Sequence, residues 1–382
     1  MIIEIKGASF ENYGAWLMLT SVMQRLDKIA PNAIIVLASR GQASLQRRNE
    51  LGALRKIDLR ARWLDLNGAT RFIPAFLRRF LIGRGVVFER DLDAIIDIAG
   101  FGYSDQWGGD YAIRHAVAEA KRLAESKRHY IFMPQAFGPF SAQTTRDLIR
   151  RKLPYASLVA ARDQISYATI RDITGEFDGL MMLGDFTNGI DMADVKRHQI
   201  PSPYMVVVPN ANMLGGHSTQ QGWAARYVDV LSTAIAEANE LGLAVILINF
   251  GGRMDQALIN KLHNLWPAAE LASVTSDLEV KALVSEATLA FSSRYHACIC
   301  ALSAGVPCLG TSWSHKYEAL YDDYGVQDLL LAPNVAPVEV RRLIRNSMEP
   351  SAAIRSKLQR RASELRANTE SLWRLVEDTL KK

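Results

Sequence analysis

Four basic or titratable side chains stand shortly after two apolar runs that predict buried strands. The runs are residues 287–291 and residues 307–309, and the side chains are Arg294, His296, His315 and Lys316. Ligands of open α/β sheets bind in the crevice beyond the carboxyl ends of the strands, so we expect these groups to share one crevice. Cations beside a helix N-terminus favour an anionic ligand.

Arg294 and His296 are expected on a strand–turn–helix unit. Residues 294–303 are compatible with a helix that stops at Gly305, and Ser292 and Ser293 are the expected N-cap residues. The neighbouring run and its loop then bring His315 and Lys316 to the same edge of the sheet.

Short apolar runs alternate with helix-compatible stretches along the whole chain, starting with residues 2–5, 15–29 and 34–37. This alternation predicts βαβ units and an α/β fold with parallel sheets. The proline-containing segment DVKRHQIPSPY interrupts it and predicts a linker. The expected organisation is an N-terminal domain (1–193), a linker (194–203), a C-terminal domain (204–336) and terminal helices that pack back on the domains (337–382).

Further candidates lie where other predicted strands end. The loop AGFGYSDQWGGD follows residues 94–98, and its Tyr103, Asp105 and Trp107 favour a sugar, because aromatic faces cover C–H groups while carboxylates bind hydroxyls. A structural loop is the alternative. Asn12 stands in a turn-forming loop after the first strand. Acceptor binding is predicted for these four residues.

Two more arginines occupy positions suited to anion binding. Arg162 follows the predicted strand 157–160 and precedes a helix, where either a surface salt bridge or a ligand contact is expected. Arg253 follows Gly251 and Gly252 in a turn that can approach a phosphate closely.

The composition is that of a soluble globular protein, with 382 residues, 49% hydrophobic and 22% charged. Neither a basic leader with a long apolar core nor an apolar run of about 20 residues is found, so a cytoplasmic location is expected. A net charge of +5 is too small to imply nucleic acid as a partner.

The positive charge is concentrated between Arg40 and Arg90, where twelve Lys or Arg face four Asp or Glu, an excess of eight. Within this segment, FIPAFLRRFLIGRGVVF mixes bulky apolar residues with arginines. Two interpretations fit: peripheral docking on an anionic membrane surface or lipid-linked phosphate, or an amphipathic helix that packs its apolar side on the core.

The string SSRYHACICALSAGVPCLG followed by SWSHKYEALYDDYG resembles the C-terminal signature of the polysaccharide pyruvyl transferases. NYG, QAFGPF, ARDQIS and GDF occur in that family's order, so the resemblance spans roughly residues 1–330. It implies two Rossmann-like domains that face each other across a cleft, as in the GT-B glycosyltransferases. It also implies phosphoenolpyruvate as donor, a sugar diol as acceptor, and a pyruvate ketal on a surface polysaccharide or its lipid-linked precursor.

The chemistry of this donor suits the candidate residues. A carboxylate and a phosphate on one small skeleton require fixed cations, for which Arg294 and Arg162 are the fork-shaped candidates and Lys316 a third charge. His315 and Arg253 complete the predicted donor site. His296 is the expected general acid for the methylene carbon. Asp105 or Asp185 is the expected base.

No cofactor is expected, because phosphoenolpyruvate enters as a substrate, and no metal, because ligand spacing is missing near the cations. A nucleotide-sugar glycosyltransferase of the same architecture is the main alternative, since fold does not fix function. A two-lobed binding protein and a non-catalytic regulatory partner are the others.

Overall fold

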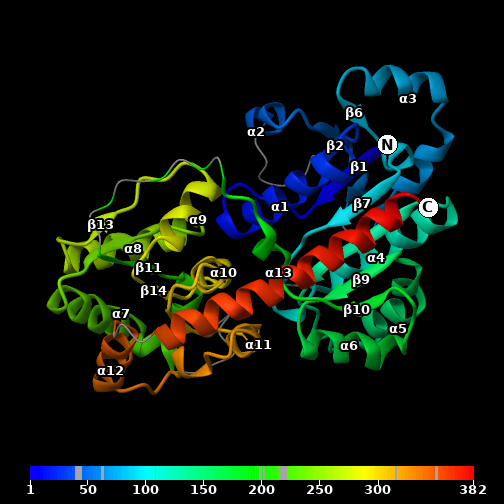
Figure 1. Ribbon diagram of the computed structural model, residues 1–382. Helices are drawn as coiled ribbons and strands as arrows, with labels where there is room; N and C mark the ends of the chain where they lie inside the picture. The colour runs from blue at the N-terminus through cyan, green and yellow to red at the C-terminus, as the bar shows by residue number, and fades with distance from the viewer. Residues whose placement is uncertain are drawn as a thin grey trace. The chain divides into compact units, whose positions relative to one another are not determined.

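The computed structural model describes residues 1–38, 45–61, 64–107, 109–193, 195, 197, 200, 203–215, 222–314, 316–348 and 352–382. These residues form two compact units (Figure 1). Unit 1 comprises Met1–Phe10, Met18–Gly189 and Asn368–Lys382, and unit 2 comprises Glu11–Leu17 and Ile190–Ala367. Within the described residues, no helix combines the length and apolarity needed to cross a membrane.

Unit 1 is built on a parallel sheet with the strand order β10-β9-β8-β7-β1-β2-β3-β6. The strands are β1 (Ile2–Lys6), β2 (Ile34–Ala38), β3 (Leu54–Lys56), β6 (Val86–Val87), β7 (Ala94–Asp97), β8 (His129–Gln135), β9 (Leu158–Ala161) and β10 (Leu180–Met182). The central strand β7 is buried at every position, as expected for a parallel sheet covered on both faces. A separate antiparallel pair joins β4 (Arg60–Ala61) to β5 (Leu64–Asp65).

The helices of unit 1 follow its strands in alternation, which confirms the predicted α/β pattern (Figure 1). They are α1 (Tyr13–Ile29), α2 (Leu45–Glu50), α3 (Ala75–Ile82), α4 (Gly109–Glu125), α5 (Gln143–Lys152) and α6 (Gln164–Thr174). Short 3-10 turns lie between them: η1 (Asn67–Phe72), η2 (Glu89–Asp91), η3 (Asp105–Trp107), η4 (Leu153–Tyr155) and η5 (Phe186–Gly189). The helix α6 begins where it does because Asp163 accepts a hydrogen bond from the backbone N–H of Ser166.

The helix α3 contains no fully buried residue, but its last residue, Ile82, is partly buried and packs against the core of unit 1. Arg78 also attaches the helix to unit 1 through an ion pair with Asp91. The interpretation of an amphipathic helix that packs on the core therefore holds only in part, because the phenylalanines of this segment are exposed to solvent.

A group of buried charges lies inside unit 1. Lys56 reaches Glu4 at 2.6 Å and Glu119 at 2.5 Å, and all three side chains are almost completely buried. Burial by itself lowers the pKa of Lys56, but the carboxylates of Glu119 and Glu4 outweigh it and raise the pKa above its usual range. Lys56 is therefore charged and acts as the shared counter-ion of two carboxylates.

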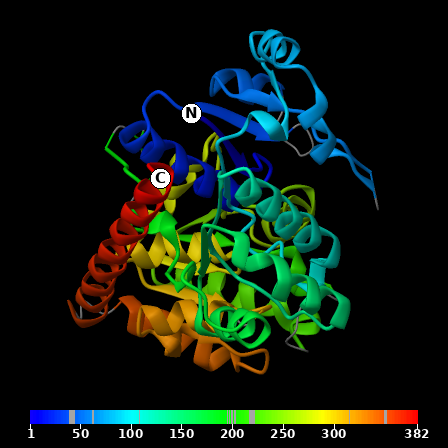
Figure 2. The ribbon, with the colours of Figure 1, turned by 90° about the vertical axis from the view of Figure 1, so that its right-hand side faces the viewer.

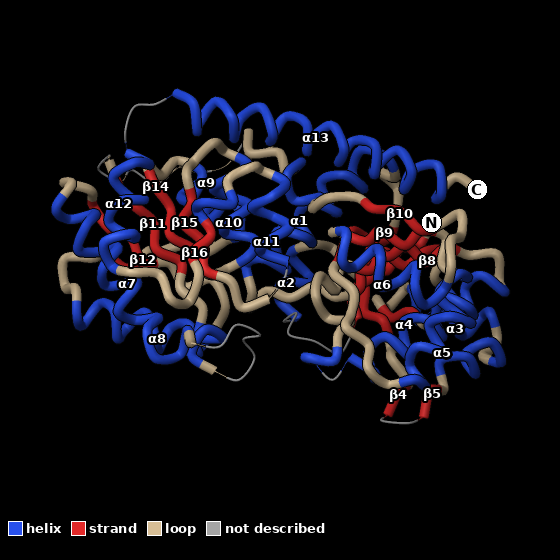
Figure 3. The backbone as a smooth tube through the Cα atoms, turned by 90° about the horizontal axis from the view of Figure 1, so that it is seen from below, coloured by secondary structure: helices blue, strands red, loops and turns tan. Residues whose placement is uncertain are grey.

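Unit 2 contains a second parallel sheet with the order β13-β12-β11-β14-β15-β16. Its strands are β11 (Tyr204–Val208), β12 (Ala244–Leu247), β13 (Glu270–Leu271), β14 (Leu289–Ser292), β15 (Cys308–Thr311) and β16 (Leu330–Leu331). Helices enclose these strands (Figure 3): α7 (Trp223–Glu240), α8 (Arg253–Leu265), α9 (Asp277–Ser285), α10 (Tyr295–Ser303), α11 (Lys316–Asp323) and α12 (Pro337–Met348). The turns η6 (Ala211–Leu214) and η7 (Gln327–Leu329) complete it.

The long terminal helix α13 (Ala352–Leu380) contributes to both units, as does α1 (Figure 2). Within unit 2, Arg355 donates to the carbonyl of Thr288 and Arg366 to that of Ser303. Within unit 1, the ring of Trp373 packs edge-on against Phe186. The compact units thus place residues 11–17 and 190–367 together in unit 2 and residues 368–382 in unit 1.

Candidate functional site

The carboxyl edge of the unit 2 sheet carries most of the predicted donor residues. Strand order reverses around β11, which has β12 on one side and β14 on the other, so the crevice between β11 and β14 is the expected ligand position. Asn210 follows β11 and its side chain donates to the carbonyl of Ser293, the residue after β14. This bond ties the two strand ends together at that position.

The start of α10 differs from the serine cap that the sequence predicted. Arg294, not a serine, occupies the N-cap position, without a side-chain cap bond. Ser292 accepts instead from the backbone N–H of Arg294 at 3.1 Å. The hydroxyl of Ser293 accepts from Tyr227 and lies 2.7 Å from that of Thr311. The prediction that Ser292 or Ser293 caps the helix is wrong, because both hydroxyls form their hydrogen bonds at the strand ends. The N-cap position is occupied by Arg294.

Arg294 is held in place by two features that are distant in sequence. Its Nε donates to Oδ2 of Asp255 at 2.8 Å, and its Nη2 lies 2.6 Å from the same oxygen. Its guanidinium also lies against Gly251, where any Cβ atom would overlap it. Asp255 is fully buried and accepts a further bond from the backbone of Ala211. Nη1 has no bond to a described residue, which leaves one edge of the fork for an anion.

His296 lies in the first turn of α10, half-buried, and is covered by the segment Asn12–Gly14. A Cβ atom on Gly14 would stand only 2.5 Å from Nδ1 of His296. Tyr13 fixes the segment to unit 2, because its N–H donates to the carbonyl of Phe250 and its ring packs edge-on against that of Phe250. Asn12 accepts from the N–H of Gly14 at 2.9 Å.

This contact changes the expected position of Asn12. The sequence assigned it to the N-terminal domain as an acceptor contact, whereas the structure places residues 11–17 in unit 2 and against the candidate general acid. Local sequence pattern could not reveal this, because a Gly/Asn turn after a strand carries no information about its long-range contact.

Lys316 is nearly buried at the start of α11 and lies among three aromatic rings. Its Nζ is 4.5 Å from the ring centre of Trp313, 5.3 Å from that of Tyr295 and 5.7 Å from that of Tyr317. Ring faces attract a cation and take the place of some of its hydration. Tyr295 also packs edge-on against His296, so the first turns of α10 and α11 meet through these rings. His315 lies outside the described residues.

The tyrosines beneath this edge were not found from the sequence. Tyr317 donates to the carbonyl of Ser293 at 2.7 Å and accepts from the indole of Trp313. Burial raises the pKa of both Tyr227 and Tyr317 above the usual value, so both stay neutral donors. Their hydrogen bonds to Ser293 hold the chain at the end of β14, directly before Arg294. Tyr317 stands within the signature string SWSHKYEALYDDYG, whereas Tyr227 carries no sequence signal of this kind.

Arg253 is the first residue of α8 and its side chain is exposed. Of the predicted GGR turn, it is therefore Gly251 that has a defined contact with the site.

In unit 1, Arg162 follows β9 as expected, but its predicted surface salt bridge is a buried one. Its Nη1 lies 3.2 Å from Oδ2 of Asp185, and both side chains are 3% exposed. Oδ1 of Asp185 accepts from the N–H and hydroxyl of Thr187. The backbone N–H of Arg162 donates to the carbonyl of Gln135, the last residue of β8.

The side chain of Gln135 is a further candidate at this edge. It is fully buried, and neither atom of its amide has a hydrogen-bond partner among the described residues. Buried amides are almost always satisfied, so this one calls for a water or a ligand group. Its position beside Arg162 makes the carboxyl ends of β8 and β9 the polar site of unit 1.

The three predicted acceptor residues in the loop after β7 differ in their surroundings. Tyr103 is buried in the core of unit 1, where its hydroxyl donates to Asp97 at 2.5 Å, so its side chain serves packing and is not accessible to a sugar. Burial, with the charge of Asp97, raises its pKa well above the usual value. Asp105 is half-buried and accepts from the backbone N–H of Ser141 at 2.7 Å. The side chain of Trp107 lies outside what the structure describes.

Solved structures similar to this chain include UDP-GlcNAc 2-epimerases and a glycosyltransferase. The UDP-GlcNAc 2-epimerase of Neisseria meningitidis matches with a TM-score of 0.59 and 10% identity, covering 98% of this chain and 99% of that one. The enzyme of the same name from Methanocaldococcus jannaschii gives 0.58 and 11%, covering 92% and 94%. WaaG, a glycosyltransferase of lipopolysaccharide biosynthesis, gives 0.52 and 13%, covering 98% of each chain. At these identities the likeness shows the fold alone, and it confirms a GT-B-like α/β architecture.

The family is narrower than the fold. The model of the polysaccharide pyruvyl transferase family matches residues 12–315, and the chain belongs to this family of enzymes. The matched region starts at Asn12, in the segment that covers His296, and ends beside Lys316. No curated protein matches the chain in sequence.

Proposed function

We propose that this enzyme transfers the pyruvyl group of phosphoenolpyruvate to two hydroxyls of one sugar, in a surface polysaccharide or its lipid-linked precursor, with release of phosphate. The single observation that carries the proposal is the placement of Arg294 and His296 in one helical turn at the carboxyl edge of unit 2, with Lys316 joined to them through Tyr295. The family match supports it.

Arg294 is the proposed anion clamp. Asp255 fixes two of its nitrogens, so the guanidinium does not have to be ordered when the donor binds, and the outer edge meets the carboxylate or phosphate. Lys316 supplies a second positive charge from a partly desolvated position, where its attraction for an anion is stronger than in water.

His296 is the proposed general acid. In the first step a sugar hydroxyl adds to C2 of the enol while His296 gives a proton to the methylene carbon, which becomes a methyl group. The hydroxyl proton passes to a base. In the second step the neighbouring hydroxyl replaces phosphate at C2, and its proton ends on the released phosphate. The cations stabilise the charge of this leaving group.

For the base we favour Asp105 over Asp185. The carboxylate of Asp185 already pairs with Arg162 and accepts hydrogen bonds from the N–H and hydroxyl of Thr187. Asp105 is partly exposed, and its carboxylate accepts a hydrogen bond from the backbone N–H of Ser141. The buried amide of Gln135 and the neighbouring Arg162 are the proposed polar contacts of unit 1.

The test is acceptor-dependent phosphate release from phosphoenolpyruvate by purified protein. His296→Ala and His296→Gln are expected to lower the rate by about 10²- to 10⁴-fold, the usual contribution of a general acid. His263→Gln, which changes a histidine of α8 whose ring bonds to the backbone carbonyl of Ala269, is the matched control. Wild-type activity in His296→Ala would remove the general-acid role. Turnover of a nucleotide sugar, with none of phosphoenolpyruvate, would make the protein a glycosyltransferase.

The acceptor is identified by mass spectrometry of lipid-linked saccharides after incubation with the donor. A gain of one pyruvate ketal on a single sugar is expected, and ketal formation only on free monosaccharides would contradict the lipid-linked acceptor.

A further inference from the structure

The segment of η1 and α3 exposes three phenylalanines to solvent. Phe72, Phe76 and Phe80 are 74%, 76% and 55% exposed, although phenylalanine is ordinarily a core residue. Phe76 and Phe80 are four residues apart and so lie on one face of α3. The helix lies at the edge of unit 1 in both ribbon views (Figure 1, Figure 2). An aromatic surface of this kind marks a contact with something outside the unit.

The charges among these rings are all positive. Residues 71–84, RFIPAFLRRFLIGR, contain four arginines and neither Asp nor Glu. The guanidinium of Arg84 lies 3.6 Å from the ring centre of Phe80, and that of Arg71 lies 4.7 Å from that of Phe72. Arginines combined with exposed aromatic residues on a helix are typical of segments that lie in the head-group region of a membrane. Two copies of the chain would repel each other here.

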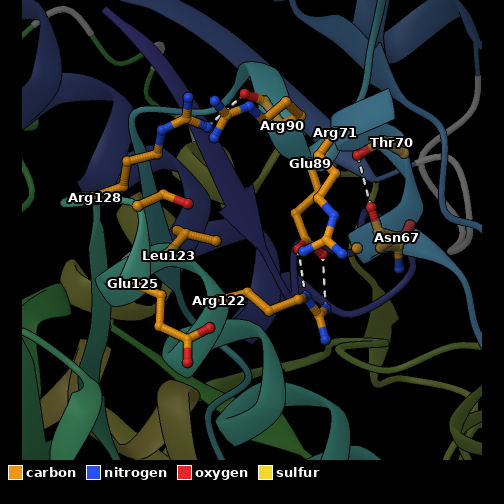
Figure 4. Close-up of a pocket in the computed structure, with 11 residues that line it drawn as sticks. Asn67, Thr70, Arg71, Glu89, Arg90, Arg122, Leu123, Glu125 and Arg128 are labelled. Carbon is orange, nitrogen blue, oxygen red and sulfur yellow. Dashed lines mark hydrogen bonds and ion pairs between the residues drawn. The ribbon is translucent and has the colours of Figure 1, made fainter. Parts of the chain in front are cut away.

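A cavity of about 250 Å³ adjoins the segment (Figure 4). Four arginines line it: Arg71, Arg90, Arg122 and Arg128. Its two carboxylates are already engaged, because Glu89 binds Arg122 through two hydrogen bonds and Glu125 pairs with Lys121 outside the cavity.

The other three arginines have no carboxylate partner among the described residues. Arg128 donates to the backbone carbonyl of Arg90, so two guanidiniums lie close together. Burial and the charge of Arg90 lower the pKa of Arg128, although the carboxylates of Asp93 and Asp91 act in the opposite direction. An anion placed between these arginines would relieve their repulsion.

The cavity and the aromatic surface are joined through two short links. Arg71 of the cavity wall precedes Phe72 directly, and Arg78 of α3 pairs with Asp91, the neighbour of Arg90. A ligand that satisfies both parts must carry an anionic group and an apolar part, as an anionic lipid with its head-group phosphate and acyl chains does.

We propose that η1, α3 and the adjoining arginine cavity form a docking surface for an anionic lipid bilayer, in which Phe72, Phe76 and Phe80 enter the interface and the cavity holds a lipid head-group phosphate. This proposal deepens the proposed function. It rests on that function for one point, which is that a lipid-linked acceptor would be presented at a membrane. The docking itself needs neither donor nor acceptor.

The test is co-sedimentation of the full chain, without substrates, with vesicles of phosphatidylcholine alone or mixed with phosphatidylglycerol, at low and high salt. Binding is expected only to the anionic vesicles and is expected to weaken with salt. Each Phe→Ser change at positions 72, 76 and 80 is expected to lower affinity roughly ten-fold. Each Arg→Gln change at positions 71 and 90 is expected to lower it about five-fold and to reduce the salt dependence.

Matched controls lie in unit 2. Met254→Ser and Val338→Ser remove equally exposed apolar side chains, and Arg360→Gln removes an exposed arginine of α13, so none of them should change binding. Circular dichroism checks that all variants are folded. As a second measurement, Phe76→Trp is expected to shift its fluorescence to the blue on anionic vesicles.

Absence of binding to anionic vesicles at low salt would overturn the proposal, as would wild-type binding by the triple phenylalanine variant. A concentration-dependent dimer that this variant abolishes would assign the surface to a second copy instead. Because phosphate release is measured separately on a water-soluble acceptor, failure of docking and failure of the proposed chemistry can be told apart.

Discussion

The contact between Gly14 and His296 allows a single added methyl group to test how the general acid is positioned. In Gly14→Ala the new Cβ would stand 2.5 Å from Nδ1 of His296, whereas ordinary contacts begin near 3.4 Å. The imidazole or the segment 12–14 must therefore move by about 0.9 Å. Displacement on this scale lowers rates by about 10²-fold when it affects a reacting group.

The effect on stability is expected to be small, which separates it from the effect on the reaction. Gly14 lies in the first turn of α1, where alanine favours the helix by up to about 1 kcal/mol. Crowding against the imidazole costs about 1–3 kcal/mol. The net loss is about 0–2 kcal/mol, a shift of a few degrees in Tm.

The assay compares kcat for acceptor-dependent phosphate release with Tm from calorimetry. Gly215→Ala is the matched control, since it makes the same change in unit 2 where nothing lies within 4 Å of the new methyl group. The control should keep wild-type kcat. A Gly14→Ala enzyme with wild-type kcat and Tm would refute the inference that residues 12–14 hold His296, and a loss of kcat equal to the loss of folded protein would refute it as well.

Three further predictions concern Arg294 and the buried charges. Gly251→Ala forces the guanidinium of Arg294 away from Asp255, so the KM for phosphoenolpyruvate should rise by about ten-fold or more, and an unchanged KM would contradict the clamp. Lys56→Met removes the ion-pair partner of Glu4 and leaves Glu119 paired with Lys6, and denaturant unfolding should show a loss of about 3–5 kcal/mol, so an unchanged stability would contradict the counter-ion role. Burial alone would raise the pKa of Glu119, but Lys56 and Lys6 hold it well below the usual value. Its contribution to stability is thus present above the unfolded pKa of about 4.3 and lost as the pH falls through the lower folded value. This acid-side slope should be shallower in Glu119→Gln, and an unchanged slope would contradict the assignment.

Much of the fold was predictable because its signals are local. The runs 2–5, 34–37 and 287–291 are apolar over the length of a strand, and each appears as a parallel strand at or within about a residue or two of its expected position. The helix after β14 was also expected, because residues 294–303 contain no breaker before Gly305. Its cap was not, since the hydroxyls of Ser292 and Ser293 serve bonds that depend on the tertiary structure.

The site was predictable only in part. Residue type and a position at a strand end were enough to select Arg294, His296 and Lys316, because the carboxyl edge of a parallel sheet follows from the alternation itself. Asp255, the partner of Arg294, is 39 positions away in the sequence, and Gly14, which lies against His296, is more than 280 positions away. No local pattern connects residues at such separations.

The sequence by itself determined the two parallel α/β units, the family resemblance and the cluster of basic residues, because strand and helix periods and motif residues are properties of short stretches. Only the tertiary structure decided that residues 11–17 belong with unit 2, that Tyr103 is a packing residue, and that the phenylalanines of η1 and α3 stay exposed. The physical reason is that burial and pairing depend on which distant surfaces meet, and an apolar or charged side chain carries the same local pattern whether its partner is the core, a ligand or a membrane.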